Sequence, residues 1–110
     1  MALTKEQILA ADDIARESVN VPEWSGDVWV ASMSAAARDK FDGFLVTRDL
    51  NDASSRAMLV SLCLVDDSGA LMFSADELAR KSYAALDRIV PVAMRLNGLG
   101  KQAQADIEKN

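Results

Sequence analysis

The hydrophobic pattern of the first third of the chain predicts a short helix followed by a hairpin. Thr4 and Gln7 have the spacing of a capping box just before a pair of apolar residues, and the acidic pair 12–13 ends or loosens this helix. The period then drops to two on either side of a loop that contains Pro22, because two valines alternate with Ser18 and Asn20 and two more with Asp27 and Trp29. This alternation predicts a β-hairpin over about residues 18–31.

In the middle of the chain, apolar residues recur at helical spacing. Ser34 predicts the N-cap of a helix that reaches Leu45. A polar loop at 48–55 ends in a second cap near Ser54, and the run 56–65 that follows is apolar nearly all round. A strand would fit so short a run, but the preceding cap favours a buried central helix.

A turn at 66–69 and a short extended piece precede two more helices. The first opens with a capping box at 74–77, and Ser82 caps the second. Pro91 predicts a bend or a local break in this second helix, and the pair 97–98, Asn-Gly, predicts its end. The second helix has one broad apolar stripe, which consists of Leu86, Ile89, Val90, Ala93 and Met94.

Together these elements predict a mainly α, small α+β fold: a compact bundle of about four to five helices with one N-terminal β-hairpin. We expect a single domain over residues 1–110, because no linker and no internal repeat divides the chain. The polar stretch 101–110 carries one large apolar residue and predicts no more than a frayed end.

Composition and charge narrow the class of function. Half of the residues are hydrophobic and 26% are charged, as in ordinary globular proteins, and the net charge of −5 argues against binding to a nucleic-acid backbone. The longest apolar run, 57–65, is nine residues broken by Ser61, well short of the roughly 20 that span a bilayer. We therefore expect a cytoplasmic protein with neither a nucleic acid nor a membrane as its partner.

The residues that carry most enzyme chemistry are scarce. The chain has no histidine, and its single cysteine, Cys63, lies in the most apolar run, which predicts a buried and inert thiol. Adjacent carboxylates at 12–13, 66–67 and 76–77 occupy positions where helix caps and turns favour acids. We expect no catalytic, cofactor or metal site, and hence no enzyme.

One stretch outlines a helix-turn-helix, a common DNA-binding motif. Residues 74–95 combine two capped helices with four basic residues, which are Arg80, Lys81, Arg88 and Arg95. Pro91 interrupts the second helix, the turn lacks a glycine, and the chain is acidic. A small DNA-binding regulator is therefore an alternative function.

The order of segments along the chain resembles the tail assembly chaperones of long-tailed bacteriophages and prophages. The segments are KEQILAADD, VPEWSGDVWV, AAARDKF, DDSGALMFSADEL, YAALDRIVPVAMRLNGL and the terminal IEKN. The most specific pieces are VPEW, followed by a turn and V-x-V, and the LDR…RLNGL helix end. The resemblance runs from Lys5 to Asn110, and Pro91 departs from the helix former expected at its position.

This resemblance implies a non-enzymatic protein without cofactors that binds the tape measure protein while tail-tube subunits polymerise around it. It implies work in the cytoplasm of the bacterial host and absence from the mature virion. Further implied partners are the tail-tube protein, a frameshifted longer form of the same chain and a second copy of it. A permanent head–tail or tail structural protein is another alternative.

We expect the partner to bind through apolar surface at one of two places. The first is the hairpin with Trp24 and Trp29, since a two-stranded ribbon cannot cover both indoles and exposed tryptophan is a common binding anchor. The second is the stripe, with Leu86, Ile89, Val90 and Met94 as its large residues.

Overall fold

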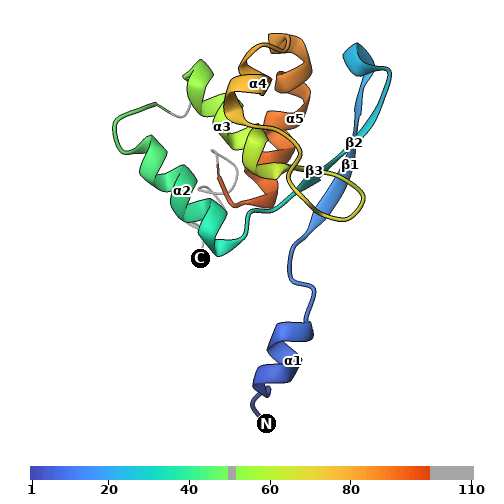
Figure 1. Cartoon of the computed structure of the whole chain (residues 1–110), viewed down its shortest axis with the longest axis vertical. Helices are drawn as coiled ribbons and strands as arrows, with labels where there is room; N and C mark the ends of the chain where they lie inside the picture. Colours follow the sequence, from blue (N-terminus) through green and yellow to red (C-terminus); the bar gives the residue numbers. More distant parts are fainter. Residues whose placement is uncertain (50–51, 100–110) are drawn as a thin grey trace, which may run out of the picture.

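The computed structural model describes residues 1–49 and 52–99, which fold into helices and one small antiparallel sheet joined by turns and loops (Figure 1). The predicted mainly α, small α+β class with an N-terminal hairpin is confirmed. The predicted frayed end at 101–110 lies outside the described residues. In chain order the elements are α1 (Lys5–Ala10), β1 (Arg16–Val21), the 3-10 helix η1 (Pro22–Trp24), β2 (Gly26–Ala31), α2 (Ala35–Leu45), α3 (Ala53–Cys63), β3 (Leu64–Val65), α4 (Ala75–Ala79) and α5 (Tyr83–Leu96).

Side-chain caps begin each helix close to where the sequence predicts them. Thr4, Ser34, Ser74 and Ser82 each accept a hydrogen bond from the backbone N–H three residues on, and Thr4 and Ser74 form complete capping boxes. The cap of α3 differs from the expected position, because the carboxylate of Asp52 accepts from the N–H of Ser54 at 2.7 Å. An aspartate caps a helix as well as a serine does, so α3 begins earlier than predicted.

The sheet has a third strand that the sequence pattern did not predict. β1 and β2 pair antiparallel, and β3 adds to the other side of β2 through Trp29–Val65 and Val30–Leu64. The run predicted as helix to residue 65 is helical only to Cys63, where the backbone becomes extended. The Leu64 N–H still donates to the Val60 carbonyl of α3, but Leu64 and Val65 then pair with β2 instead of continuing the helix.

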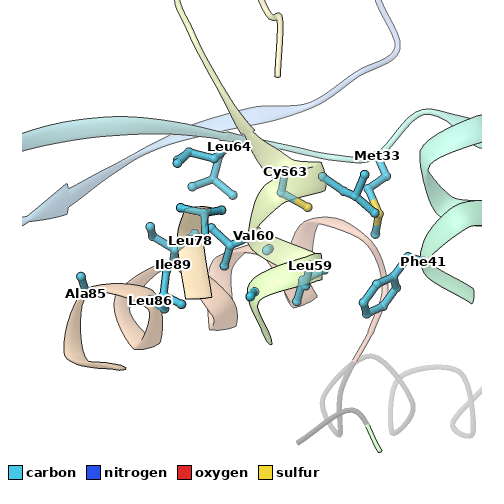
Figure 2. Close-up of a cluster of buried hydrophobic side chains, with 14 of the residues drawn as sticks. Met33, Phe41, Leu59, Val60, Cys63, Leu64, Leu78, Ala85, Leu86 and Ile89 are labelled. Atoms are coloured by element: carbon cyan, nitrogen blue, oxygen red, sulfur yellow. The ribbon is translucent and has the colours of Figure 1, made fainter. Parts of the chain in front are cut away.

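α3 is the centre of the hydrophobic core, as its all-round apolar sequence predicts. It packs against α2, α4 and α5, and seven of its eleven residues are buried. Figure 2 shows Phe41 of α2, Leu78 of α4 and Ile89 of α5 gathered around Leu59 and Val60. Each neighbouring helix therefore covers one side of α3.

The apolar stripe of α5 is part of this core. Leu86, Ile89 and Ala93 are buried, and Val90 and Met94 are half-buried against the same cluster. α5 also packs against β1, β2 and η1, so it lies between α3 and the hairpin.

Pro91 does not break α5, which runs without interruption from Tyr83 to Leu96. The proline is exposed, so water can hydrate the carbonyl group that loses its helical donor. The helix ends where predicted, in a Schellman motif: Gly98 has φ +67°, its N–H donates to the Arg95 carbonyl, and the Leu99 N–H donates to the Met94 carbonyl at 2.7 Å.

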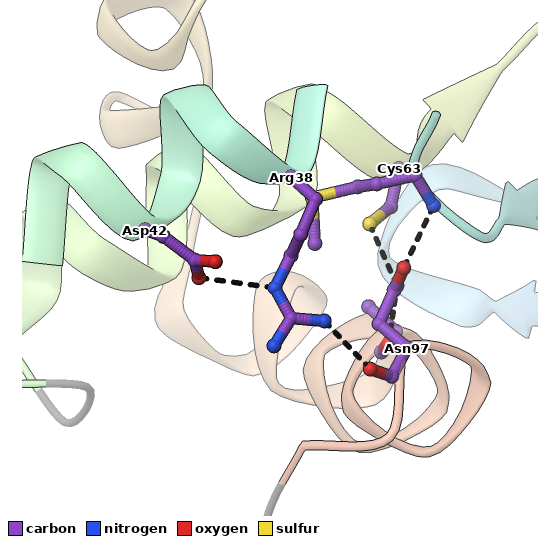
Figure 3. Close-up of polar contacts among 6 residues, drawn as sticks. Arg38, Asp42, Cys63 and Asn97 are labelled. Atoms are coloured by element: carbon purple, nitrogen blue, oxygen red, sulfur yellow. Dashed lines mark hydrogen bonds and ion pairs between the residues drawn. The ribbon is translucent and has the colours of Figure 1, made fainter. Parts of the chain in front are cut away.

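Asn97 joins four segments at this helix end (Figure 3). Its Oδ1 accepts from the backbone N–H of Met33 at 2.7 Å, and its Nδ2 donates to the Ala93 carbonyl and to the Sγ of Cys63. Its backbone carbonyl accepts from Arg38, which also pairs with Asp42 one turn along α2. The side chain and the backbone carbonyl of Asn97 together connect α5, α3, α2 and the segment that follows β2.

α1 stands apart from these packed elements at one end of the molecule (Figure 1). None of its residues is buried.

We predict that Asn97→Ala destabilises the fold by about 2 kcal/mol, because it leaves the N–H of the buried residue Met33 without its acceptor. Urea unfolding followed by circular dichroism measures the change. Asn20→Ala is the matched control: Asn20 is exposed and bonds only Asp27 across the hairpin, so its loss should cost less than about 0.5 kcal/mol. Equal losses for the two variants would contradict the role assigned to Asn97.

We predict that Pro91→Ala stabilises the chain by about 2 kcal/mol. Alanine restores a helical N–H donor, and this gain exceeds the backbone entropy that the unfolded chain regains. Pro22→Ala is the control, because Pro22 occupies the first turn of η1, where proline is favourable. Thermal unfolding should show a higher midpoint for the first variant and an unchanged or lower one for the second.

Candidate binding groove

An apolar groove of about 260 Å³ opens between the hairpin and α4. Leu64 and Leu78 are buried at its base, whereas Met72 and Phe73 on its rim are 42% and 38% exposed. The lining residues are Trp24, Val28, Leu64, Met72, Phe73, Leu78 and Lys81.

The short third strand explains why this groove exists. β3 pairs only with Trp29 and Val30. Among the described residues, the edge of β2 opposite β1 therefore has no strand beside it at residues 26–28, which include Val28. The chain leaves the sheet through the turn 66–69, returns to make one isolated bridge at Leu71, and continues to α4. Met72 and Phe73 therefore form a rim beside the hairpin without closing over it.

Two ion pairs hold the hairpin against α5. Arg88 donates from Nε to Glu23 at 2.7 Å, and Arg95 pairs with Glu17. The hydrogen bond from Arg88 lowers the pKa of the Glu23 carboxyl below its ordinary value. Both acidic partners lie on the hairpin. Two of the four basic residues of the helix-turn-helix outline thus serve hairpin packing, which argues against the DNA-binding alternative.

The two tryptophans have different surroundings. Trp24 is half-buried, packs against the core and forms one wall of the groove. Trp29 donates from Nε1 to a carboxylate oxygen of Asp67 at 3.0 Å, and the guanidinium of Arg16 lies 4.4 Å from its ring centroid. Trp29 therefore fixes the turn after β3 to the hairpin, and only Trp24 lines the groove.

Of the other predicted contact residues, none lines the groove. Leu86 and Ile89 are 6% and 0% exposed, so they offer a partner almost no surface in this structure. Sequence reasoning missed Met72 and Phe73, although three consecutive large apolar residues after a turn were a readable signal.

The acidic pairs have structural roles or face solvent. Asp66 accepts hydrogen bonds from Ser68 and Ala70 in the turn, and these bonds lower the pKa of its carboxyl. Asp76 and Glu77 occupy the first turn of α4, and the pair 12–13 is exposed. Within residues 1–49 and 52–99, no three His, Cys, Asp or Glu side chains are grouped to hold a metal ion. In the same ranges, no helix is both long and apolar enough to cross a membrane.

The groove can thus bind apolar side chains, with Lys81 available beside them for one negative charge. Its wall of one tryptophan, one phenylalanine and one methionine is apolar and adaptable, because methionine repacks around ligands of different shape.

No family model and no curated protein matches the chain. Among solved structures, it is similar to the structure of the bacteriophage HK97 tail assembly chaperone. The TM-score is 0.59 at 22% sequence identity, over 87% of this chain and 95% of that one. The two proteins share a fold. The resemblance that the segment order indicated is confirmed at this level.

We predict that the Cys63 thiol reacts slowly with thiol reagents in the native protein and rapidly in denaturant. The side chain is buried, and burial raises the pKa of the thiol from 9.0 to about 11. Stopped-flow labelling at pH 8 measures both rates, and rapid labelling of the native protein would contradict the burial of the Cys63 side chain.

The same shift predicts a pH dependence of stability. The fold favours the neutral thiol. Its contribution to the free energy of unfolding is therefore complete below pH 9 and is lost as the pH rises through about 11. Cys63→Ala lacks this contribution, so its free energy of unfolding should fall less than that of the parent chain between these pH values.

Proposed function

We propose that this chain is a non-enzymatic tail assembly chaperone that binds the tape measure protein of a long-tailed phage and assists tail-tube polymerisation. The observation that carries the proposal is an open apolar groove on a fold shared with a phage tail assembly chaperone. Tape measure and tail-tube proteins are the proposed partners, and the host cytoplasm before virion completion is the proposed place of action.

An amphipathic helix is the occupant that the groove chemistry favours. Such a helix places apolar side chains on one face at intervals of three and four residues and docks them into apolar grooves. Trp24, Met72 and Phe73 supply the apolar contact surface, and Lys81 favours a partner with an acidic residue next to its anchors. A long helical tape measure protein has many turns on which such a face can recur.

The net negative charge of the chain is compatible with a chaperone that exposes an apolar groove. A protein with an open apolar groove tends to associate through it, and a net charge of −5 opposes aggregation of the free chaperone and of its complexes.

The residues predicted from the sequence to contact the partner have different roles in this proposal. Trp24 contacts the partner directly, and Trp29 holds the hairpin that carries it. Leu86, Ile89, Val90 and Met94 belong to the packed stripe of α5 that supports the hairpin from within.

We predict that co-expression with the tape measure protein of the same phage keeps that protein in the soluble fraction, and that the two co-purify. Met72→Asp should weaken the complex about tenfold or more, because it puts a charge where an apolar anchor binds. Val46→Asp is the matched control: Val46 is 81% exposed at the end of α2 and does not line the groove. It should behave as the parent chain does.

A tape measure protein that is equally soluble with and without this chain, and that forms no complex with it, would contradict the proposed function. A complex that survives Met72→Asp but not Val46→Asp would place the contact elsewhere.

A further inference from the structure

A second hollow adjoins the groove, and Lys81 lines both. The second hollow has a volume of about 200 Å³ and lies where the start of α3 meets the end of α4 and the start of α5, at the end of the molecule opposite α1 (Figure 1). Ser54, Arg56 and Tyr83 line it, and Leu86 is its buried apolar residue. A partner that lies in the groove can therefore continue past Lys81 into the second hollow.

The two hollows differ in their chemistry. The groove is apolar except for Lys81, whereas the second hollow has two cationic side chains, Arg56 and Lys81. The guanidinium of Arg56 lies 4.9 Å from the ring centroid of the exposed Tyr83, and this stacking helps to hold the cation in place. None of the described residues that line either hollow is acidic. The second hollow therefore presents positive charge on a chain whose net charge is −5.

The charge of Lys81 is not neutralised within residues 1–49 and 52–99. Arg38, Arg88 and Arg95 each form an ion pair in these ranges, but Lys81 and its neighbour Arg80 form none. Both of these side chains are exposed. The positive charge between the two hollows is thus available to an acidic group from outside the described chain.

We propose that the second hollow binds an acidic side chain of the same helix whose apolar anchors occupy the groove. This assignment rests on the proposed function, because the helix is then a segment of the tape measure protein, the client. Residues three and four apart lie on one face of a helix, so an acidic residue one turn beyond the last anchor faces the same way as the anchors. Lys81 and Arg56 are the residues that select it.

The second hollow adds specificity that the groove lacks. Apolar anchors alone fit many amphipathic helices, and methionine and phenylalanine on the groove rim adapt to several of them. A client with a basic residue one turn beyond its anchors would place like charges together at Lys81, which excludes it. The client segment is therefore an amphipathic helix with apolar residues at one end of its binding face and an acidic residue at the other.

Charge reversal in the complex tests the proposal. Lys81→Glu should weaken binding of the tape measure protein about fivefold or more, because it replaces an ion pair with two like charges. Lys40→Glu is the matched control: Lys40 is exposed on α2, lines neither hollow, and its reversal changes the net charge of the chain by the same amount. It should bind as the parent chain does. Circular dichroism verifies that both variants are folded.

Overlapping peptides of the tape measure protein, each of about 25 residues so that a helix can form, identify the other side of the contact. Peptides that bind the parent chain should have an acidic residue one turn beyond their apolar anchors. Replacing that residue with lysine should weaken binding to the parent chain, and Lys81→Glu should bind the lysine peptide more tightly than the parent does. Such a reciprocal rescue requires that the two side chains meet, and Lys40→Glu should not produce it.

Three results would overturn the proposal: equal weakening by Lys81→Glu and Lys40→Glu, a lysine peptide that Lys81→Glu does not rescue, or duplex DNA of random sequence that binds the parent chain as tightly as the client does. If Met72→Asp still weakens the complex in these cases, the groove binds the client and the proposed function stands. If the parent chain forms no complex at all, the proposed function fails and this assignment fails with it.

Discussion

An α-helix that is apolar on every side must be covered on every side, and α3 imposes this requirement on the rest of the chain. α2, α4 and α5 each take one side, and the chain that leaves α3 is drawn directly into the sheet as β3. The cover is uneven, because α4 has five residues and β3 has two. Leu64 and Leu78 are buried, but the adjoining side chains of the hairpin, Trp24 and Val28, are only partly covered. The groove lies where this cover is missing.

The features that the sequence could predict depend on interactions between residues close together in the chain. Caps such as Ser34 and Ser82, the stop at Asn97 and the helical stripe of α5 depend on residues within one or two turns of each other. β3 escaped prediction because a short, fully apolar run fits a helix and a strand equally well. Its state was decided by β2, more than thirty residues earlier in the chain. Separation along the chain also explains why the pairing of Arg88 with Glu23, 65 residues apart, could not be predicted.

The candidate site was predicted only in part, for a related reason. Apolar periodicity predicts which face of a helix avoids water, but not whether a neighbour in the same chain or a partner covers it. Periodicity correctly predicted the apolar stripe of α5, but the stripe is covered by the hairpin and α3 of the same chain. Trp24 and Trp29 could not be told apart in the sequence, because their surroundings depend on η1 and on the turn at Asp67. Met72 and Phe73 belong to a visible run of large apolar residues, but the run has no periodicity, so the sequence does not show that these two side chains are exposed beside a groove.

Under the proposed function, the groove favours partners by the length of their helices as well as by their chemistry. A groove of about 260 Å³ holds the apolar anchors of one helix at a time. A partner segment shorter than roughly 12 residues must be ordered as a helix when it binds, which costs affinity, whereas a segment within a long helix is already formed. A groove of this kind therefore favours a long helical client over short peptides with the same apolar residues.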